Sequence, residues 1–212
     1  MQNSSGVYFG KNSRVDVGAI VATTHTVNED KFMQGTLEFD RNGSTASVIN
    51  DGEIKTTLNG YVALLAPEVR NRGLIVAQMG TVVMASGEQI TLNFSNNNHL
   101  SSITASSTTI DALIENKHAV QAHGGTIILS AKAMNQLISG IINQEGLLDA
   151  GSDAFEVVKI GGRILLSGDK TLLAKNSITT TSSFQSGGEV SIAARELIAD
   201  ESSVVAVSTF RQ

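Results

Sequence analysis

A repeat of about 20 residues between Val48 and Gly87 is the feature that most constrains how this chain can fold. Two runs of β-favouring residues follow one another there, and each run is interrupted by Asn and Gly. Asn50 and Asn71 lie 71 − 50 = 21 positions apart, and Gly60 and Gly80 lie 80 − 60 = 20 positions apart. Units of this length cannot bury an apolar face alone, so they are typical of a stacked solenoid.

Five glycine-led segments repeat one pattern, in which the second and fourth positions after the glycine are large and apolar. The segments begin at Gly60, Gly80, Gly125, Gly162 and Gly188. Strand side chains alternate between faces, so these two positions share one face. We expect two interior columns, one of Val62, Val82, Ile127, Ile164 and Val190, and one of Leu64, Met84, Leu129, Leu166 and Ile192. The third position is mixed, which indicates that hairpins cover part of the outer face.

The turns between these segments also repeat. A slot that favours glycine indicates positive φ, and Asn side chains bond their own backbone in turns. We expect the positive-φ slot at Gly52, Gly73, His118 and Gly146. We expect stacked side-chain amides at Asn50, Asn71, Asn116 and Asn143.

The pattern predicts one all-β domain over residues 1–212, a parallel β-helix interrupted by three insertions. Residues 28–46 are predicted to form an extra-helical turn and hairpin, because Asn42-Gly43 is a strong hairpin signal. Residues 88–104 are predicted to form a second extra-helical hairpin. Apolar residues at helical spacing predict a short helical turn over 130–142. A β-sandwich or a doubly wound α/β fold would explain the fixed template less well.

Composition excludes several function classes. The net charge is −5 and no run of Lys or Arg exists, so we expect no nucleic-acid partner. No apolar stretch reaches the roughly 18 residues of a membrane-spanning helix. The chain has no cysteine, which excludes disulfides and thiolate metal sites. We expect no cofactor.

The side chains that could carry chemistry do not form a catalytic pattern. His118 and His123 lie five positions apart across a strand, and neither they nor His25 and His99 have metal-ligand spacing. Acidic residues near turns are Asp149, Asp153, Glu156 and Asp169, without matching acids in adjacent rungs. We therefore expect no catalytic and no metal site, and we do not expect an enzyme.

Several strings of residues resemble the haemagglutination-activity region of two-partner secretion exoproteins, a family that includes filamentous haemagglutinin and the high-molecular-weight adhesins. The strings are residues 3–11, residues 17–24 and, most specifically, Gly60 to Asn71, and the likeness covers most of residues 3–150. The resemblance implies a right-handed parallel β-helix with extra-helical hairpins. In the family a signal peptide, an earlier Asn-Pro motif and a cap precede this region, so we expect an N-terminally incomplete domain.

The resemblance also implies a function. The family's domain is recognised by the periplasmic POTRA domains of an outer-membrane pore, and it seeds β-helix folding of an adhesin or haemagglutinin at the cell surface. A family motif, Asn-Pro-Asn-Gly-Ile, falls on residues 3–7, where Pro and the second Asn are absent. Asn3, Gly6 and Val7 match it, and with the two hairpins they are the candidate recognition residues. A host-cell or glycan receptor is implied for the full-length protein.

Two alternatives stay open from the residues alone. A secreted glycan-binding or glycan-cleaving β-helix would place a row of acids and aromatics along one outer face. A structural stalk fragment would need no site at all.

Overall fold

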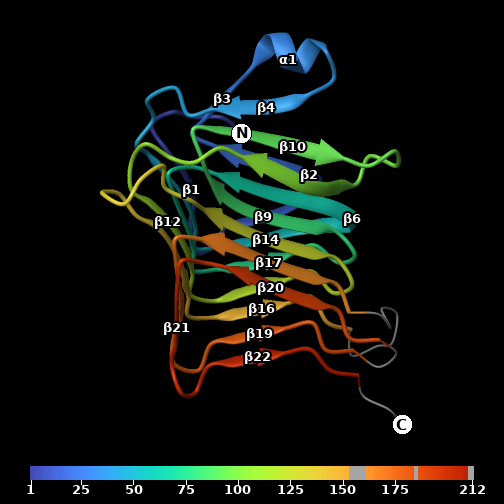
Figure 1. Cartoon of the computed structure of the whole chain (residues 1–212). Helices are drawn as coiled ribbons and strands as arrows, with labels where there is room; N and C mark the ends of the chain where they lie inside the picture. The colour runs from blue at the N-terminus through green and yellow to red at the C-terminus, as the bar shows by residue number, and fades with distance from the viewer. Residues whose placement is uncertain (153–160, 184–185, 210–212) are drawn as a thin grey trace.

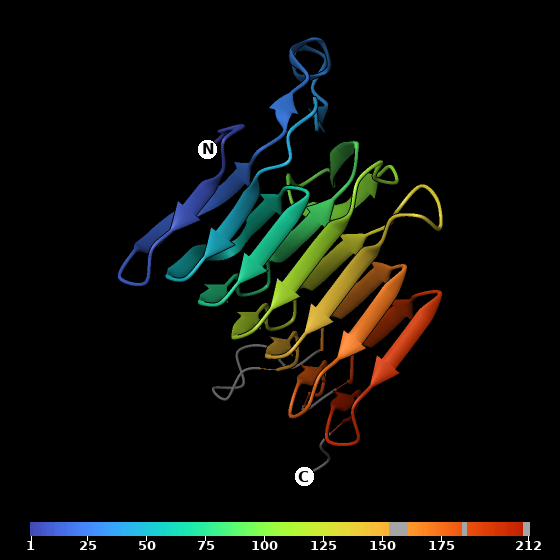
Figure 2. The same cartoon turned by 90° about the vertical axis from the view of Figure 1, so that its left-hand side faces the viewer.

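Parallel strands stacked along one axis build this protein, which we describe from a computed structural model that places residues 1–152, 161–183 and 186–209 (Figure 1). The strands define a three-sided β-helix, which confirms the fold class expected from the repeat. One side is a seven-stranded parallel sheet, seen face-on in Figure 2. In stacking order its strands are β1 (Val7–Phe9), β5 (Ser47–Asn50), β7 (Glu68–Asn71), β12 (Ala112–Asn116), β15 (Gly140–Gln144), β18 (Lys170–Leu173) and β21 (Glu196–Ala199).

Two long strands connect the other two sides. β2 (Arg14–Thr23) and β6 (Glu53–Leu65) pair with each other along both sides, so each passes around a corner of the helix. The second side continues from the first half of β6 through β8 (Leu74–Val76), β13 (Ala119–Gln121), β16 (Leu147–Asp149), β19 (Ile178–Thr180) and β22 (Val204–Ala206). The third side continues from the second half of β6 through β9 (Thr81–Ser86), β14 (Thr126–Ala131), β17 (Arg163–Gly168) and β20 (Glu189–Ala193).

A four-stranded antiparallel sheet lies outside the helix, against its third side (Figure 1). Its order is β11 (Leu100–Ala105), β10 (Gln89–Phe94), β4 (Leu37–Asp40) and β3 (Thr26–Val27). A short helix, α1 (Glu29–Met33), connects β3 to β4 and begins after Asn28, whose Oδ1 accepts a hydrogen bond from the Lys31 amide at 3.1 Å. In the described part of the chain, no helix is long and apolar enough to span a membrane.

The Asn42-Gly43 turn differs from the predicted hairpin. β4 pairs with β3 and β10, whereas β5 pairs with β1 and β7, so the turn carries the chain from one sheet to another. The dipeptide supplies positive φ at both positions, 49° and 76°, as a tight turn requires. The strand before the turn is held by the extra-helical sheet and the strand after it by the stack, so the local hairpin signal is overridden.

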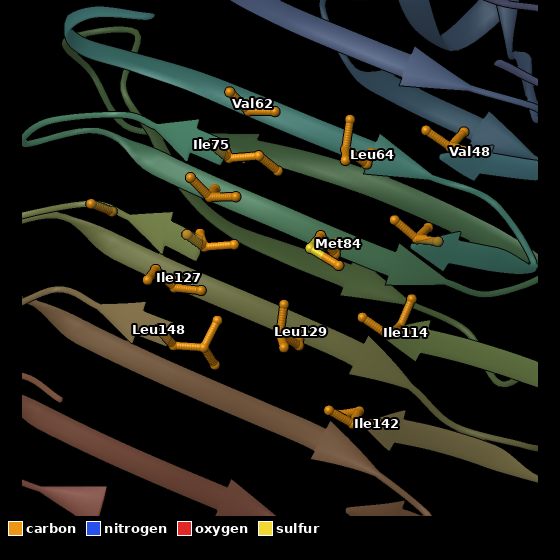
Figure 3. Packing of buried hydrophobic residues seen from close by; sticks show 14 of the residues in the cluster. Val48, Val62, Leu64, Ile75, Met84, Ile114, Ile127, Leu129, Ile142 and Leu148 are labelled. Carbon is orange, nitrogen blue, oxygen red and sulfur yellow. The ribbon is translucent and has the colours of Figure 1, made fainter. Parts of the chain in front are cut away.

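The interior columns form as the sequence predicts. Val62 lies opposite Val82, which lies opposite Ile127, and the same register continues to Ile164 and Val190. The second column runs through Leu64, Met84, Leu129, Leu166 and Ile192. Figure 3 shows members of both columns pointing into one continuous core, together with residues from the opposite sides such as Ile114 and Ile142.

A second core lies between the helix and the extra-helical sheet. Phe39, Ile90, Leu92 and Leu100 contribute from the sheet, and Ala63, Leu65, Val83, Ala85 and Ile128 contribute from the helix. This confirms that hairpins cover part of the outer face. It also explains the mixed third position after each glycine: it is fully buried at Ala63 and Val83 but polar at Ser191, which lies beyond the reach of the sheet.

Buried side-chain amides form a ladder through four coils. Asn50 donates to Asn71 at 2.8 Å, Asn71 donates to Asn116 at 2.8 Å, and Asn116 donates to Gln144 at 2.9 Å. The fourth member is therefore Gln144 and not Asn143, which bonds Glu145 instead. In the strand register Asn116 lies directly opposite Gln144.

Glycine is favoured at the turn slot for a different reason from the positive φ that we predicted. Gly52, Gly73 and Gly146 do not have positive φ, and neither does His118. A Cβ on Gly73 would lie 2.1 Å from the carbonyl oxygen of Gly52 in the coil before it. Glycine is needed because successive backbones approach closely. Where His118 occupies the slot, the bond from the Ala119 amide to the Gly73 oxygen lengthens to 3.4 Å.

The segment predicted as a helical turn over 130–142 contains no helix. β14 extends to Ala131, a bend and a turn follow, and β15 begins at Gly140. The apolar residues that suggested a helix have no surface to pack on, since Leu137 is 94% exposed and Met134 is 61% exposed. An amphipathic helix this short is stable only when its apolar face is buried.

Candidate functional site

The predicted recognition residues lie in the turn that leads into the first coil. The Asn3 side chain accepts a hydrogen bond from the Ser5 amide at 3.0 Å, and its carbonyl oxygen accepts one from the Gly6 amide at 3.0 Å. Gly6 has φ +117°, which favours glycine. Val7 points into the core and lies opposite Val48. Asn3 and Gly6 therefore shape the turn, whereas Val7 anchors it.

Hydrogen bonds attach this turn to the neighbouring segments of the chain. The Asn3 amide donates to the carbonyl oxygen of Thr23 at 3.0 Å. The Ser44 hydroxyl donates to the carbonyl oxygen of Ser4 at 3.3 Å. An open hollow of about 430 Å³ borders the turn; its lining residues are Met1, Gln2, Asn3, Gly6, Val7 and Tyr8. Exposed Asn3, Ser4 and Ser5 form the part that a partner could contact.

The chain crosses between the helix and the extra-helical sheet at four places: residues 24–25, 41–44, 87–88 and 106–109. A side-chain network, which we call the clasp, joins three of these crossings. Arg41 donates from Nε to both carboxylate oxygens of Glu88 at 2.9 Å, and from Nη2 to the Thr109 hydroxyl at 3.2 Å. It also donates to the carbonyl oxygen of Ser44 at 3.0 Å. The clasp thereby fixes the sheet relative to the turn at residues 3–7.

Glu88 is ionised in the clasp. Burial, the largest single influence, would raise the pKa of this carboxyl, but donors outweigh it and lower the pKa below 4.5. These donors are the Arg41 guanidinium and both the hydroxyl and amide of Thr109, which bond Glu88 at 2.6 and 2.8 Å. The charge of Glu88 thus balances that of Arg41, whose side chain is only 11% exposed.

His25 occupies the fourth crossing and is fully buried. Its Nε2 lies 2.8 Å from the carbonyl oxygen of Gly87, so this nitrogen carries the proton. Its Nδ1 is buried without a hydrogen-bond partner among the described residues. Burial, as the main cause, lowers the pKa of His25 below 6.5, with a smaller contribution from the positive charge of Arg41. His25 is therefore neutral and links β2 to the start of β10.

The outer face of the extra-helical sheet is polar. Asn28 donates to Glu38 and Asp40, at 3.3 and 3.2 Å, and Thr91 donates to Glu38 at 3.2 Å. Asn93 donates to the Thr104 hydroxyl at 3.1 Å. These carboxylates already have donors, and the face offers amides and hydroxyls to a partner.

A polar hollow of about 480 Å³ follows the corner between the first and second sides of the helix. Its acids are paired: Asp51 accepts from the Tyr8 hydroxyl at 2.8 Å and bonds Arg72 at 3.0 Å, and Glu53 bonds Arg14 at 3.1 Å. Carboxylates held this way stabilise neighbouring coils. They are not arranged as a free acid and base.

The remaining candidate side chains are dispersed. His123 lies 3.3 Å from Asp149, and Asp169 accepts from the amides of Ala133 and Gly140 at 2.6 and 3.0 Å. Asp153 and Glu156 lie outside the described residues. Among the residues that are described, no three His, Cys, Asp or Glu side chains lie close enough to hold a metal ion.

Sequence reasoning missed the clasp and His25. Arg41, Glu88 and Thr109 are far apart in the chain, and no motif links them. The one available signal was position, because each lies in or close to a predicted insertion.

Comparison with known proteins agrees with the architecture of a β-helix that carries an extra-helical sheet. The family model of the TPS (two-partner secretion) secretion domain matches residues 1–151. The chain belongs to this family. It therefore contains the kind of domain that directs export of an exoprotein through the outer membrane.

One similar solved structure is the crystal structure of the HMW1 secretion domain from Haemophilus influenzae. The TM-score is 0.74 at 21% sequence identity, which shows a shared fold. The match covers 98% of this chain and 63% of that chain, so this chain spans less than two thirds of the length of its structural relative. No curated protein matches the chain.

Proposed function

We propose that this chain directs the secretion of an adhesin-like surface exoprotein. An outer-membrane partner pore recognises it through periplasmic POTRA domains, and the folded coils seed the β-helix that follows at the cell surface. The observation that carries the proposal is the family match over residues 1–151, which spans both the first coil and the whole extra-helical sheet.

The recognition surface combines the two features that the clasp holds together. The exposed turn at residues 3–5 and the polar outer face of β10 and β11 are both attached to the crossings that Arg41 and Glu88 connect. A partner that contacts both would bind a pre-organised surface and would lose little conformational freedom on binding.

The seeding role is supported by the way the coils stack. β14 pairs with β9 on one edge and with β17 on the other, and the same parallel pairing repeats from coil to coil. Each folded coil therefore provides the strand edges on which the next coil can pair.

Binding to the isolated periplasmic domains of the cognate pore tests the proposal. Ser102 and Thr104 are exposed on β11. Replacing both with Arg adds two charges that lose their water when a partner binds this surface. We expect the affinity of the S102R/T104R variant to fall by at least about tenfold, because unmatched interfacial charges cost several kcal/mol.

The Glu189→Arg variant is the matched control, since it changes the charge of an exposed strand residue on β20, beyond the extra-helical sheet. It should bind like the unaltered chain. Circular dichroism must show equal folding for both variants. Absence of binding by the unaltered chain, or equal weakening by both variants, would count against the proposed surface.

A further inference from the structure

The chain has two Asn-Gly dipeptides in contrasting environments. Asn42-Gly43 forms an exposed turn between β4 and β5. Asn59-Gly60 lies within β6, between the coils that contain β2 and β9. Both asparagines have positive φ, 49° and 62°, so backbone conformation alone does not distinguish them.

We propose that Asn42 is a site of spontaneous deamidation and isomerisation, and that the stack protects Asn59 from the same reaction. The reaction needs only water. The Gly43 backbone nitrogen loses its proton to hydroxide and attacks Cγ of Asn42, forming an N–Cγ bond. The Cγ–Nδ2 bond breaks and ammonia leaves. Water then opens the resulting succinimide at either carbonyl, which yields aspartate or isoaspartate.

The surroundings of Asn42 permit this attack. A Cβ built on Gly43 would have no heavy atom within 4 Å, so no other segment packs against this side of the turn. The Ser44 amide donates to the Arg41 carbonyl oxygen at 3.0 Å across the turn. Asn42 and Gly43, the two residues that take part in the reaction, are both exposed.

Asn59 is held by the coils on both sides. Its amide donates to the carbonyl oxygen of Gln78 at 3.0 Å. A Cβ on Gly60 would lie 2.1 Å from the carbonyl oxygen of Gly18 and 2.7 Å from Cβ of Thr56. The backbones of Gly60 and Gly18 thus approach closely, and moving the Gly60 nitrogen toward Cγ of Asn59 would disturb the pairing of β6 with β2.

Modification at Asn42 would alter the clasp. Either product adds a negative charge next to Arg41, and isoaspartate also adds a methylene to the backbone of the turn. The carbonyl oxygen of Ser44, two residues on, accepts from Arg41, and its hydroxyl donates to Ser4. The modification thus changes the anchor of the turn at residues 3–7.

Peptide mapping by mass spectrometry tests the proposal after the full-length folded chain has been held in mildly alkaline buffer. We expect the modified fraction at Asn42 to exceed that at Asn59 by at least about tenfold, because local opening is easy at an exposed turn and costly within a stacked strand. In denaturant, where both dipeptides are unfolded, the two sites should react at similar rates.

The Asn42→Gly variant is the matched control. Glycine keeps the positive φ of the turn and has no side-chain amide, so the peptide should show no mass change at this position. Equal modification of Asn42 and Asn59 in the folded chain would overturn the proposal. An unmodified Asn42 in the folded chain, under conditions where the denatured chain reacts, would also overturn it.

Discussion

The side-chain amide of Asn71 donates to Oδ1 of Asn116 at 2.8 Å, across 45 positions of sequence. The same amide donates to the carbonyl oxygen of Ala119 at 3.2 Å. The ladder is closed at both ends by apolar residues in the adjoining coils, Phe9 beside Asn50 and Leu173 beside Gln144. Four fully buried amides therefore satisfy one another inside an otherwise apolar stack.

Replacing Asn71 with Ala should destabilise the fold strongly. It leaves the Asn50 amide without its acceptor and Asn116 without a donor, both fully buried. We expect the free energy of unfolding to fall by about 3 kcal/mol, measured by urea denaturation, because each unsatisfied buried polar group costs about 1–3 kcal/mol. Asn97→Ala removes an amide from the exposed β10–β11 loop and should change stability by less than about 0.5 kcal/mol. Equal effects would contradict the ladder's role.

The close approach of successive backbones at Gly80 and Gly125 predicts that alanine is tolerated at some glycine positions and not at others. A Cβ on Gly125 would lie 2.0 Å from the carbonyl oxygen of Gly80, so Gly125→Ala must push two coils apart. We expect a loss of about 3 kcal/mol in the free energy of unfolding. Gly10→Ala is the control, because its Cβ would meet only a Tyr8 ring carbon at 3.7 Å. That variant should be neutral or slightly more stable, and a large loss there would argue against the stacking explanation.

The clasp should contribute more to the stability of the fold than an exposed Arg–Glu ion pair does. Arg41→Gln removes hydrogen bonds to Glu88, Ser44 and Thr109 from a mostly buried site. We expect the free energy of unfolding to fall by about 2 kcal/mol. Arg14, which is 85% exposed, pairs with Glu53, and Arg14→Gln should lower the free energy of unfolding by less than about 1 kcal/mol. Thermal denaturation of both variants under one set of conditions compares them.

His25 should make the fold sensitive to mild acid. Its pKa in the folded state lies below its ordinary value of 6.5, mainly through burial. Its contribution to stability is therefore fully present above pH 6.5 and is lost as the pH falls toward the lowered folded pKa. Protonation would place a donor on Nδ1, which faces no acceptor within the described structure.

The contribution of His25 to the pH dependence of stability can be separated from the contributions of the neighbouring acids. Asp40 and Glu88 act on His25 and raise its pKa, but they remain in a His25→Gln variant. We expect the urea midpoint of the unaltered chain to fall more steeply than that of the variant between about pH 7 and pH 5. Parallel slopes would show that His25 does not titrate in this range.

The parts of the fold that could be predicted are those that repeat. Val62 and Leu64 recur at equivalent positions because every coil must fill the same core, and this periodicity is visible in the sequence. The ladder was predictable for Asn50, Asn71 and Asn116, because each stands two positions before a predicted turn slot. At Gln144 the residue type changes, and only the strand register shows which amide continues the ladder.

The parts that could not be predicted depend on contacts between distant segments. Asn42-Gly43 has the composition of a hairpin turn, but pairing of β4 with β10 and of β5 with β7 separates the two flanking strands. Leu137 has helical spacing without a surface to pack on. Arg41 and Glu88 meet only because two insertions leave the stack at one corner. Local sequence does not show which distant segments meet at these points.

Export dependent on the partner pore tests the central claim most directly. The chain, preceded by a signal peptide, is produced in bacteria with or without its cognate outer-membrane pore, and the culture medium is probed for the folded protein. We expect accumulation in the medium only when the pore is present, and reduced accumulation for the S102R/T104R variant but not for Glu189→Arg. Equal amounts in the medium with and without the pore, or retention of the chain in the periplasm despite the pore, would contradict it.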